Sequence, residues 1–176
     1  SSLYGSDAMG GVVNIITKKN DDRWGGSITT GAEINPESIR GNDYTTSVSL
    51  GGPIAQNLRF SFSGQYSAQQ ADKELPEGRT GFRWGGGREG AKIASGNFGL
   101  DWDLAPGHSL AFDYDFGNWR TEPGPVPAGA EPATSTRGPR KMTRESIGLA
   151  YQGEHSFGTS RFAISQSEYR NRTTAP

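Results

Sequence analysis

The sequence has no cysteine, little net charge and no long apolar run. Without cysteine, disulfides, thiolate metal sites and a cysteine nucleophile are excluded. A membrane-spanning helix is also excluded, because it needs about 18 consecutive apolar residues. A membrane β-barrel stays possible, since its strands need only one apolar face. The net charge of -1 gives no basic surface for nucleic acid, and we expect no nucleic-acid partner.

Apolar residues are scarce throughout the chain. They make up 32% of the sequence, whereas glycine alone contributes 26 residues. Such a composition fills a helical core poorly. The sequence also begins without methionine or a polar lead-in, and we therefore expect it to be part of a longer protein.

Strict alternation of apolar and polar residues dominates the chain after residue 24. This period of two is typical of strands whose two faces meet different surroundings. It is clearest in segments 58–68, 97–104, 109–116 and 146–152, and weaker near 24–35, 43–52 and 160–171. The pattern predicts about seven strands, most of them long enough to cross a bilayer at a barrel tilt.

The connections between these strands alternate between short and long. Residues 52–57, 105–108 and 156–159 are short and rich in turn-forming residues, whereas 70–92 and 120–142 are long and without period. This sorting is typical of an up-and-down outer-membrane barrel with short periplasmic turns and long outer loops. Six aromatic residues near strand ends would suit interfacial girdles: Trp24, Tyr44, Tyr66, Trp102, Trp119 and Tyr169. Alternation alone also permits a soluble sandwich.

The first nineteen residues follow a different pattern. A glycine-punctuated stretch leads into an apolar, β-branched run that is typical of a buried strand. The segment YGSDAMGGVVNIITKK, residues 4–19, resembles the end of the plug domain in TonB-dependent outer-membrane receptors. The resemblance rests on Tyr4, Gly5, Asp7, Gly10, Gly11, Asn14 and Thr17. Segments GREG (87–90), WDLAP (102–106) and EYRNR (168–172) are similar to the catecholate-siderophore and colicin I receptors of this superfamily.

The resemblance implies an all-β architecture in three parts. Residues 1–19 would end the plug, 20–23 would link it to the barrel, and 24–176 would form the first part of a barrel that has about 22 strands in the family. About seven strands cannot close such a barrel, so an open, curved arc is expected. The signal peptide, the TonB box, most of the plug and the remaining strands would lie outside this sequence.

By resemblance, the protein would import ferric siderophore complexes across the outer membrane of a Gram-negative bacterium. No enzyme activity and no resident cofactor are implied. The expected partners are TonB, through an N-terminal region outside the chain, together with the ferric siderophore, outer-membrane lipid and lipopolysaccharide, and colicins or phages. The alternatives are a cobalamin or haem receptor of the same family and a surface-binding β-protein without transport.

The long connections supply the candidate ligand-binding residues. Ferric catecholates are anionic and carry flat rings, so guanidinium groups beside aromatic rings suit them. Such residues occur in both long connections: Arg79, Phe82, Arg83, Trp84 and Arg88 in the first, and Trp119, Arg120, Arg137, Arg140 and Lys141 in the second. The alternative is that these are solvated charges or face lipopolysaccharide.

Two other groups of residues resemble metal or catalytic sites. The carboxylate pairs Asp101/Asp103 and Asp113/Asp115 have a spacing that places them opposite the apolar residues of their strands. In a barrel that face borders the aqueous lumen, and we interpret them as solvated carboxylates. The two histidines, His108 and His155, lie at predicted turns and are too isolated in sequence to predict a metal site.

Overall fold

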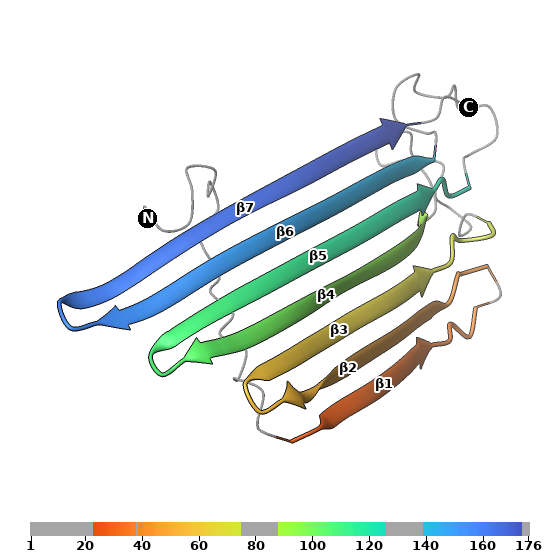
Figure 1. The fold of residues 1–176 in the computed structure, drawn as a ribbon. Coiled ribbons are helices and arrows are strands. Elements are labelled where there is room, and N and C mark those ends of the chain that lie inside the picture. The colour runs from red at the N-terminus through yellow and green to blue at the C-terminus, as the bar shows by residue number, and fades with distance from the viewer. Residues whose placement is uncertain (1–22, 38, 75–87, 126–138, 174–176) are drawn as a thin grey trace.

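The computed structural model describes residues 23–37, 39–74, 88–125 and 139–173. These residues form one antiparallel sheet whose strands follow chain order (Figure 1). The predicted plug end, 1–19, and all of the linker except Arg23 lie outside the described residues. The strands are β1 (Gly25–Glu33), β2 (Asp43–Ala55), β3 (Leu58–Gln69), β4 (Gly90–Ala105), β5 (His108–Glu122), β6 (Arg140–His155) and β7 (Gly158–Thr173).

The seven predicted strands are confirmed, and β4, β5 and β6 are much longer than their alternation indicated. β4, β5 and β6 reach 15 or 16 residues and extend into the predicted long loops. In these added ends the alternation breaks down, because polar or charged residues such as Lys92, Asn118 and Thr143 occupy the apolar side while Ile93, Trp119 and Met142 occupy the other. The backbone ladder continues all the same. The predicted loop limits, 70–92 and 120–142, were therefore too wide.

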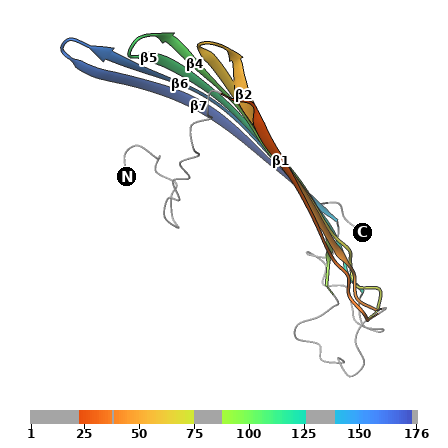
Figure 2. The same cartoon turned by 90° about the horizontal axis from the view of Figure 1, so that it is seen from below.

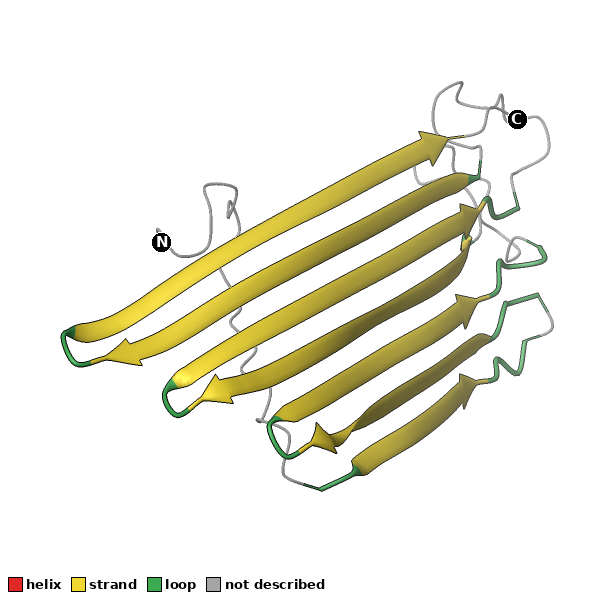
Figure 3. Ribbon diagram, viewed as in Figure 1, coloured by secondary structure: helices red, strands yellow, loops and turns green. Residues whose placement is uncertain are grey.

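Short turns lie at one end of the sheet and long connections at the other (Figures 1 and 3). Only two residues separate the paired strands at 56–57, 106–107 and 156–157. Gly107 has a φ of 77°, a left-handed conformation that glycine adopts without steric cost. The predicted sorting of connections is confirmed.

The predicted turn 52–57 was too long, because Gly52 to Ala55 belong to β2. The β2–β3 register shifts between Pro53 and Ala55. Proline cannot donate a ladder hydrogen bond and is tolerated where a strand lacks a neighbour on one side. The β1–β2 pairing ends at Gly51, so β2 has no partner strand on that side at Pro53.

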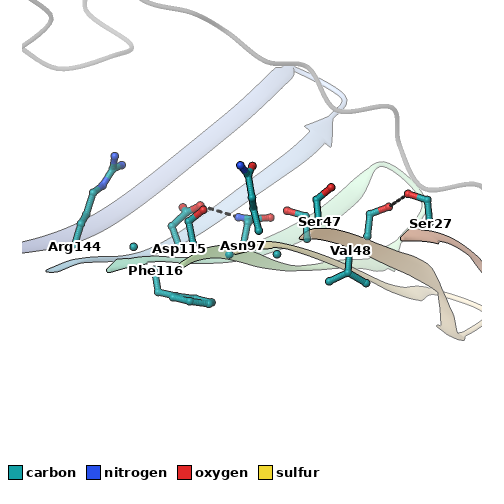
Figure 4. A pocket seen from close by; sticks show the side chains of 14 residues that line it. Ser27, Ser47, Val48, Asn97, Asp115, Phe116 and Arg144 are labelled. Atoms are coloured by element: carbon teal, nitrogen blue, oxygen red, sulfur yellow. Dashed lines mark hydrogen bonds between the residues drawn. The ribbon is translucent and has the colours of Figure 1, made fainter. Parts of the chain in front are cut away.

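The two faces of the sheet differ sharply in chemistry. On one side, which we call the apolar face, a cross-strand row of large side chains runs from β2 to β6: Leu50, Phe62, Phe98, Tyr114 and Ile147. The adjacent row on the other side, the polar face, is Ser49, Ser63, Asn97, Asp115, Ser146 and Ser167. Figure 4 shows Val48 and Phe116 pointing away from Ser47, Asn97 and Arg144.

No described element covers the apolar face. The sheet is a single curved layer in edge view (Figure 2), and no hydrophobic side chain among the described residues is buried. Ile147 and Leu149 are 46% and 43% exposed even in the interior of the sheet. An apolar surface of this extent marks contact with a partner or with lipid. Within the described chain there is no second sheet of the kind that a sandwich needs.

The sheet does not close on itself. β1 and β7 are edge strands, each paired with one neighbour, as predicted for an open arc. The described residues contain no helix that is long and apolar enough to span a membrane.

Candidate functional site

A group of guanidinium and aromatic side chains lies on the polar face near the long connections. On β5 and β6, Trp119 is the cross-strand partner of Met142. Arg144, which follows Met142 by two residues and lies on the same face, is the cross-strand partner of Tyr169 in β7. Arg140 lies at the start of β6, two residues before Met142 and therefore on the same face. We call Trp119, Arg140, Met142, Arg144 and Tyr169 the aromatic–arginine patch.

The patch offers unpaired positive charge beside aromatic rings. Tyr169 donates a hydrogen bond from its hydroxyl to Sδ of Met142, 2.9 Å away. Trp119 and Tyr169 remain 44% and 62% exposed. Among the described residues no ion pair engages Arg140 or Arg144. The patch can therefore supply charge-assisted hydrogen bonds and cation–π contacts to an anionic aromatic ligand.

The structure separates the residues that the sequence had placed together in the second long loop. Trp119, Arg120 and Arg140 lie within strands, which corrects their predicted loop position. Trp119 and Arg140 face the polar side, whereas Arg120 is the cross-strand partner of Lys141 on the apolar side. Neighbouring residues of a strand point to opposite faces, so these side chains cannot form one site.

Sequence reasoning missed Arg144 and Tyr169 as ligand candidates. Counting back by twos from Ser146 would have placed Arg144 on the polar face. Tyr169 and Trp119 were predicted to belong to interfacial girdles, but both lie on the polar face, which corrects that interpretation.

Arg88 lies just before β4 and holds several connections together. Its Nη1 atom lies 2.8 Å from Oδ2 of Asp43, and its Nη2 donates to the carbonyl oxygen of Gly41. The backbone N–H of Arg88 donates to Oδ2 of Asp72 at 2.8 Å, and Gly41 N–H donates to Oδ1 of the same carboxylate at 3.2 Å. We call these four residues the Arg88 cluster. The guanidinium is thus engaged within the protein.

The electrostatics of the Arg88 cluster favour an ionised Asp72. Burial acts to raise the pKa of this carboxyl group. The hydrogen bonds from Arg88 and Gly41, and the charges of Arg88 and Arg40, outweigh burial and lower the pKa below its ordinary value of 3.8.

The remaining ligand candidates and the plug motif lie outside the described residues. They are Arg79, Phe82, Arg83, Trp84 and Arg137, and Tyr4, Gly5, Asp7, Gly10, Gly11, Asn14 and Thr17.

The aspartate pairs lie on the polar face, as predicted. Arg59 and Asp103 form an ion pair at 2.6 Å, and Asn97 donates to Asp115 at 3.0 Å. A hollow of about 520 Å³ runs along this face, lined by serine, Asn97, Asp115 and Arg144 (Figure 4). Nowhere in the described chain do three or more His, Cys, Asp or Glu side chains form a group suited to a metal ion.

The two histidines are close in space, although their distance in sequence had suggested isolation. The ring centroids of His108 and His155 are 5.3 Å apart. His108 Nδ1 is hydrogen bonded to the Tyr151 hydroxyl at 2.7 Å. They belong to an aromatic group at the short-turn end of the sheet.

Comparison with known proteins links this geometry to a family. No family model matches the chain. The ferric enterobactin receptor PirA of Pseudomonas aeruginosa is 33% identical over 187 residues, which cover 97% of this chain and 24% of the relative. An iron-regulated outer membrane virulence protein of Vibrio cholerae is 33% identical over 78 residues, covering 44% of this chain and 12% of the relative.

A solved structure agrees with these sequence relatives. The siderophore receptor PirA of Acinetobacter baumannii superposes with a TM-score of 0.79 at 25% identity, over 97% of this chain and 25% of that one. This chain therefore spans about a quarter of the length of the relatives it matches.

Long antiparallel strands, one uncovered apolar face and sorted connections define a segment of an outer-membrane β-barrel. The protein is located in the outer membrane of a Gram-negative bacterium. Over nearly its whole length the chain is similar to TonB-dependent siderophore receptors.

Proposed function

We propose that the full-length protein binds ferric siderophore complexes of the catecholate type and imports them across the outer membrane. The observation that carries this proposal is the similarity to a ferric enterobactin receptor over 97% of the chain. In this proposal residues 1–19 end the plug, 20–23 form the linker and 24–176 form the first part of the barrel.

The aromatic–arginine patch supports a catecholate ligand. A ferric tris-catecholate has negative charge spread over aromatic oxygen atoms. Arg140 and Arg144 offer forked donors for those oxygens, while Trp119 and Tyr169 offer ring surfaces. We propose the patch as a polar-face contact for the ligand near the long connections, together with the loop residues Arg79, Phe82, Arg83, Trp84 and Arg137 predicted from sequence.

The sheet supports transport through its two faces rather than through covalent chemistry. The apolar face meets lipid, and the polar face borders an aqueous lumen that the complete barrel encloses. In this proposal TonB supplies the energy, the protein is not an enzyme and holds no resident cofactor. Lipopolysaccharide, colicins or phages are its further partners at the surface.

The test is growth of a deletion strain under iron limitation, with one siderophore supplied at a time. Loss of growth on ferric catecholates, with growth on ferric hydroxamates retained, is the expected result. Restoration by the full-length gene on a plasmid is the control. Unimpaired catecholate use combined with loss of cobalamin or haem uptake would assign the receptor to one of those ligands instead.

A further inference from the structure

The two histidines lie close together on the apolar side of the sheet, at its short-turn end. His108 begins β5 and is the cross-strand partner of Gly153 in β6, while His155 ends β6 two residues further on. Cross-strand partners, and residues two apart in one strand, share a face, so both imidazoles project from the same side. Their ring centroids are 5.3 Å apart and their ring planes are inclined at 68°. The pair lies at the opposite end of the strands from the aromatic–arginine patch.

A hydroxyl group engages one nitrogen of each ring. His108 Nδ1 is hydrogen bonded to the Tyr151 hydroxyl at 2.7 Å, and His155 Nε2 to the Ser160 hydroxyl at 2.9 Å. Within the described residues, Nε2 of His108 and Nδ1 of His155 have no hydrogen-bond partner. A neutral imidazole has one N–H and one lone pair. When each hydroxyl oxygen accepts the N–H of its histidine, the two lone pairs lie on the two remaining nitrogens.

Gly153 makes room for the first of these hydrogen bonds. A Cβ atom at this position would lie 3.0 Å from Nδ1 of His108 and 2.9 Å from Cζ of Tyr151. Phe157, in the turn after β6, stacks on His155 with ring centroids 5.0 Å apart and an angle of 2° between the planes. The two imidazoles are therefore held by contacts that do not use the nitrogens bearing the lone pairs.

The spacing of the two rings fits a shared metal ion. A bond from Zn²⁺ to an imidazole nitrogen is about 2.0–2.1 Å long, so two imidazoles at a tetrahedral angle on one ion have centroids roughly 5 Å apart. The observed separation of 5.3 Å is close to this value. A metal-ligating histidine almost always donates its other N–H to an acceptor, which fixes the orientation and tautomer of the ring. The Tyr151 and Ser160 hydroxyls occupy that position, whereas an interfacial aromatic girdle requires no hydroxyl on each imidazole.

We propose that His108 and His155 together bind one divalent transition-metal ion, Cu²⁺ or Zn²⁺, with the Tyr151 and Ser160 hydroxyls positioning the two rings. The short turns mark this end of the barrel as the periplasmic one. Neutral imidazole suits copper and zinc, whereas Ca²⁺ and Mg²⁺ require oxygen ligands. The two imidazoles fill two coordination positions, and water fills the others. Cu²⁺ is expected to bind more tightly than Zn²⁺, because affinities at a given nitrogen site follow that order.

The test uses the full-length receptor without a histidine tag, purified in mild detergent and titrated with Cu²⁺ in the absence of siderophore. H108Q and H155Q are each expected to weaken binding by more than about tenfold, since even the outer partners of a ligand contribute that much. H108Q/H155Q is expected to lose one bound ion relative to the parent, together with a two-nitrogen signal in electron paramagnetic resonance. Excess Zn²⁺ is expected to displace this ion, whereas Ca²⁺ is not.

Two tyrosine variants test the supporting hydrogen bond. Tyr151→Phe removes the hydroxyl partner of His108 and is expected to weaken Cu²⁺ binding by about tenfold. Tyr114→Phe is the matched control, because it removes a tyrosine hydroxyl from the same face nearer the centre of the sheet, and it is expected to bind as the parent does. Equal binding in these two variants would refute the positioning role of Tyr151.

Two outcomes would overturn the metal site itself. The same number of bound Cu²⁺ ions, at the same affinity, in the parent and in H108Q/H155Q would show that the pair binds no ion. Weakened binding in only one of the single variants would assign the ion to one histidine rather than to both. Altered migration in unheated gels verifies that each variant is folded. Because no siderophore is present, failure of this proposal leaves the proposed function untouched.

Discussion

Nη1 of Arg88 lies 2.8 Å from Oδ2 of Asp43, although 45 positions separate them in the sequence. This contact joins the start of β2 to the segment that leads into β4. The same arginine donates its backbone N–H to Asp72, at the end of the segment that follows β3. Three segments that enter or leave strands on the long-connection side are therefore held by one residue.

Replacing Arg88 by alanine in the full-length receptor is expected to loosen this region without unfolding the barrel. The Arg88 side chain is 33% exposed, so screening by water limits the local loss of stability to about 1–2 kcal/mol. Hydrogen exchange should accelerate at residues 39–43 and 70–74 while strand centres stay protected. The exposed pair Arg40–Glu37 provides the control: Glu37→Gln should change protection little. Unchanged exchange in R88A would show that the contacts carry no stability.

The Arg88 cluster is expected to weaken at acid pH. The pKa of Asp72 is lowered in the folded protein, so its ionised form stabilises the cluster above the ordinary value of 3.8. That contribution is lost as the pH falls below 3.8 toward the folded pKa. Hydrogen-exchange protection of Gly41 and Arg88 should therefore be constant from neutral pH to about 4 and then decline. Asp72→Asn should remove this pH dependence; a decline of the same size in the variant would assign it to another group.

Gly41 leaves no room for a side chain. A Cβ atom there would lie 2.2 Å from the carbonyl oxygen of Gln70 and 2.6 Å from its carbonyl carbon, both backbone atoms. Gly41→Ala is therefore expected to displace the 39–43 segment and to raise its hydrogen exchange at least as much as R88A does. Gly25→Ala is the control, because nothing lies within 4 Å of its Cβ position. Equal exchange in the two variants would contradict the predicted crowding.

Alternation alone predicts the strand centres well, and the structure shows why it fails at their ends. Segment 58–68 falls within β3, because Phe60 and Phe62 need an apolar surrounding and the intervening residues do not. Near Lys92 and Arg120 the strand continues, but these charged residues stand on the side that is apolar elsewhere and Ile93 and Trp119 on the other side, so the sequence signal disappears. Hydrogen bonding between backbones requires no apolar side chain.

The sequence predicted which residue types the candidate site contains, but not how these residues are arranged in space. Arginine and tryptophan near the second long connection suggested an anionic aromatic ligand. Alternate residues of a strand share a face. Which of these side chains lie together therefore becomes apparent only when they are assigned to strands rather than to a loop. Once Arg140 is placed in β6, Trp119 and Arg144 fall on its face and Arg120 on the other. The Arg88 cluster depends on pairing between distant segments, which no local pattern reveals.

The assignment of faces predicts unequal effects at two adjacent residues of β6. Ile147 lies on the apolar face and Ser146 on the polar face. In the complete barrel Ile147→Arg is expected to destabilise by about 2–4 kcal/mol if it lies near the bilayer midplane, whereas Ser146→Arg should have little effect. Folding into lipid vesicles, followed by gel migration and urea titration, measures the difference. The reverse order of stabilities would invert the two faces.

The aromatic–arginine patch predicts a charge-dependent loss of ligand affinity. In the full-length receptor, R140Q/R144Q should weaken binding of a ferric catecholate by about tenfold, because each arginine loses a charge-assisted contact that is partly screened. Added salt should reduce the difference between parent and variant, since screening weakens the same contacts in the parent. Arg161→Gln, on the polar face of β7 near the short-turn end, is the control and should bind normally.

A second substitution separates charge from ring contact within this patch. Trp119→Leu keeps apolar volume but removes the aromatic face, and it should weaken a ferric catecholate more than a ferric hydroxamate, which has no rings to stack. Intrinsic fluorescence quenching during titration gives both affinities from one preparation. If R140Q/R144Q and Trp119→Leu both bind the catecholate as the parent does, the patch is a solvated surface and the ligand contacts must lie elsewhere in the receptor.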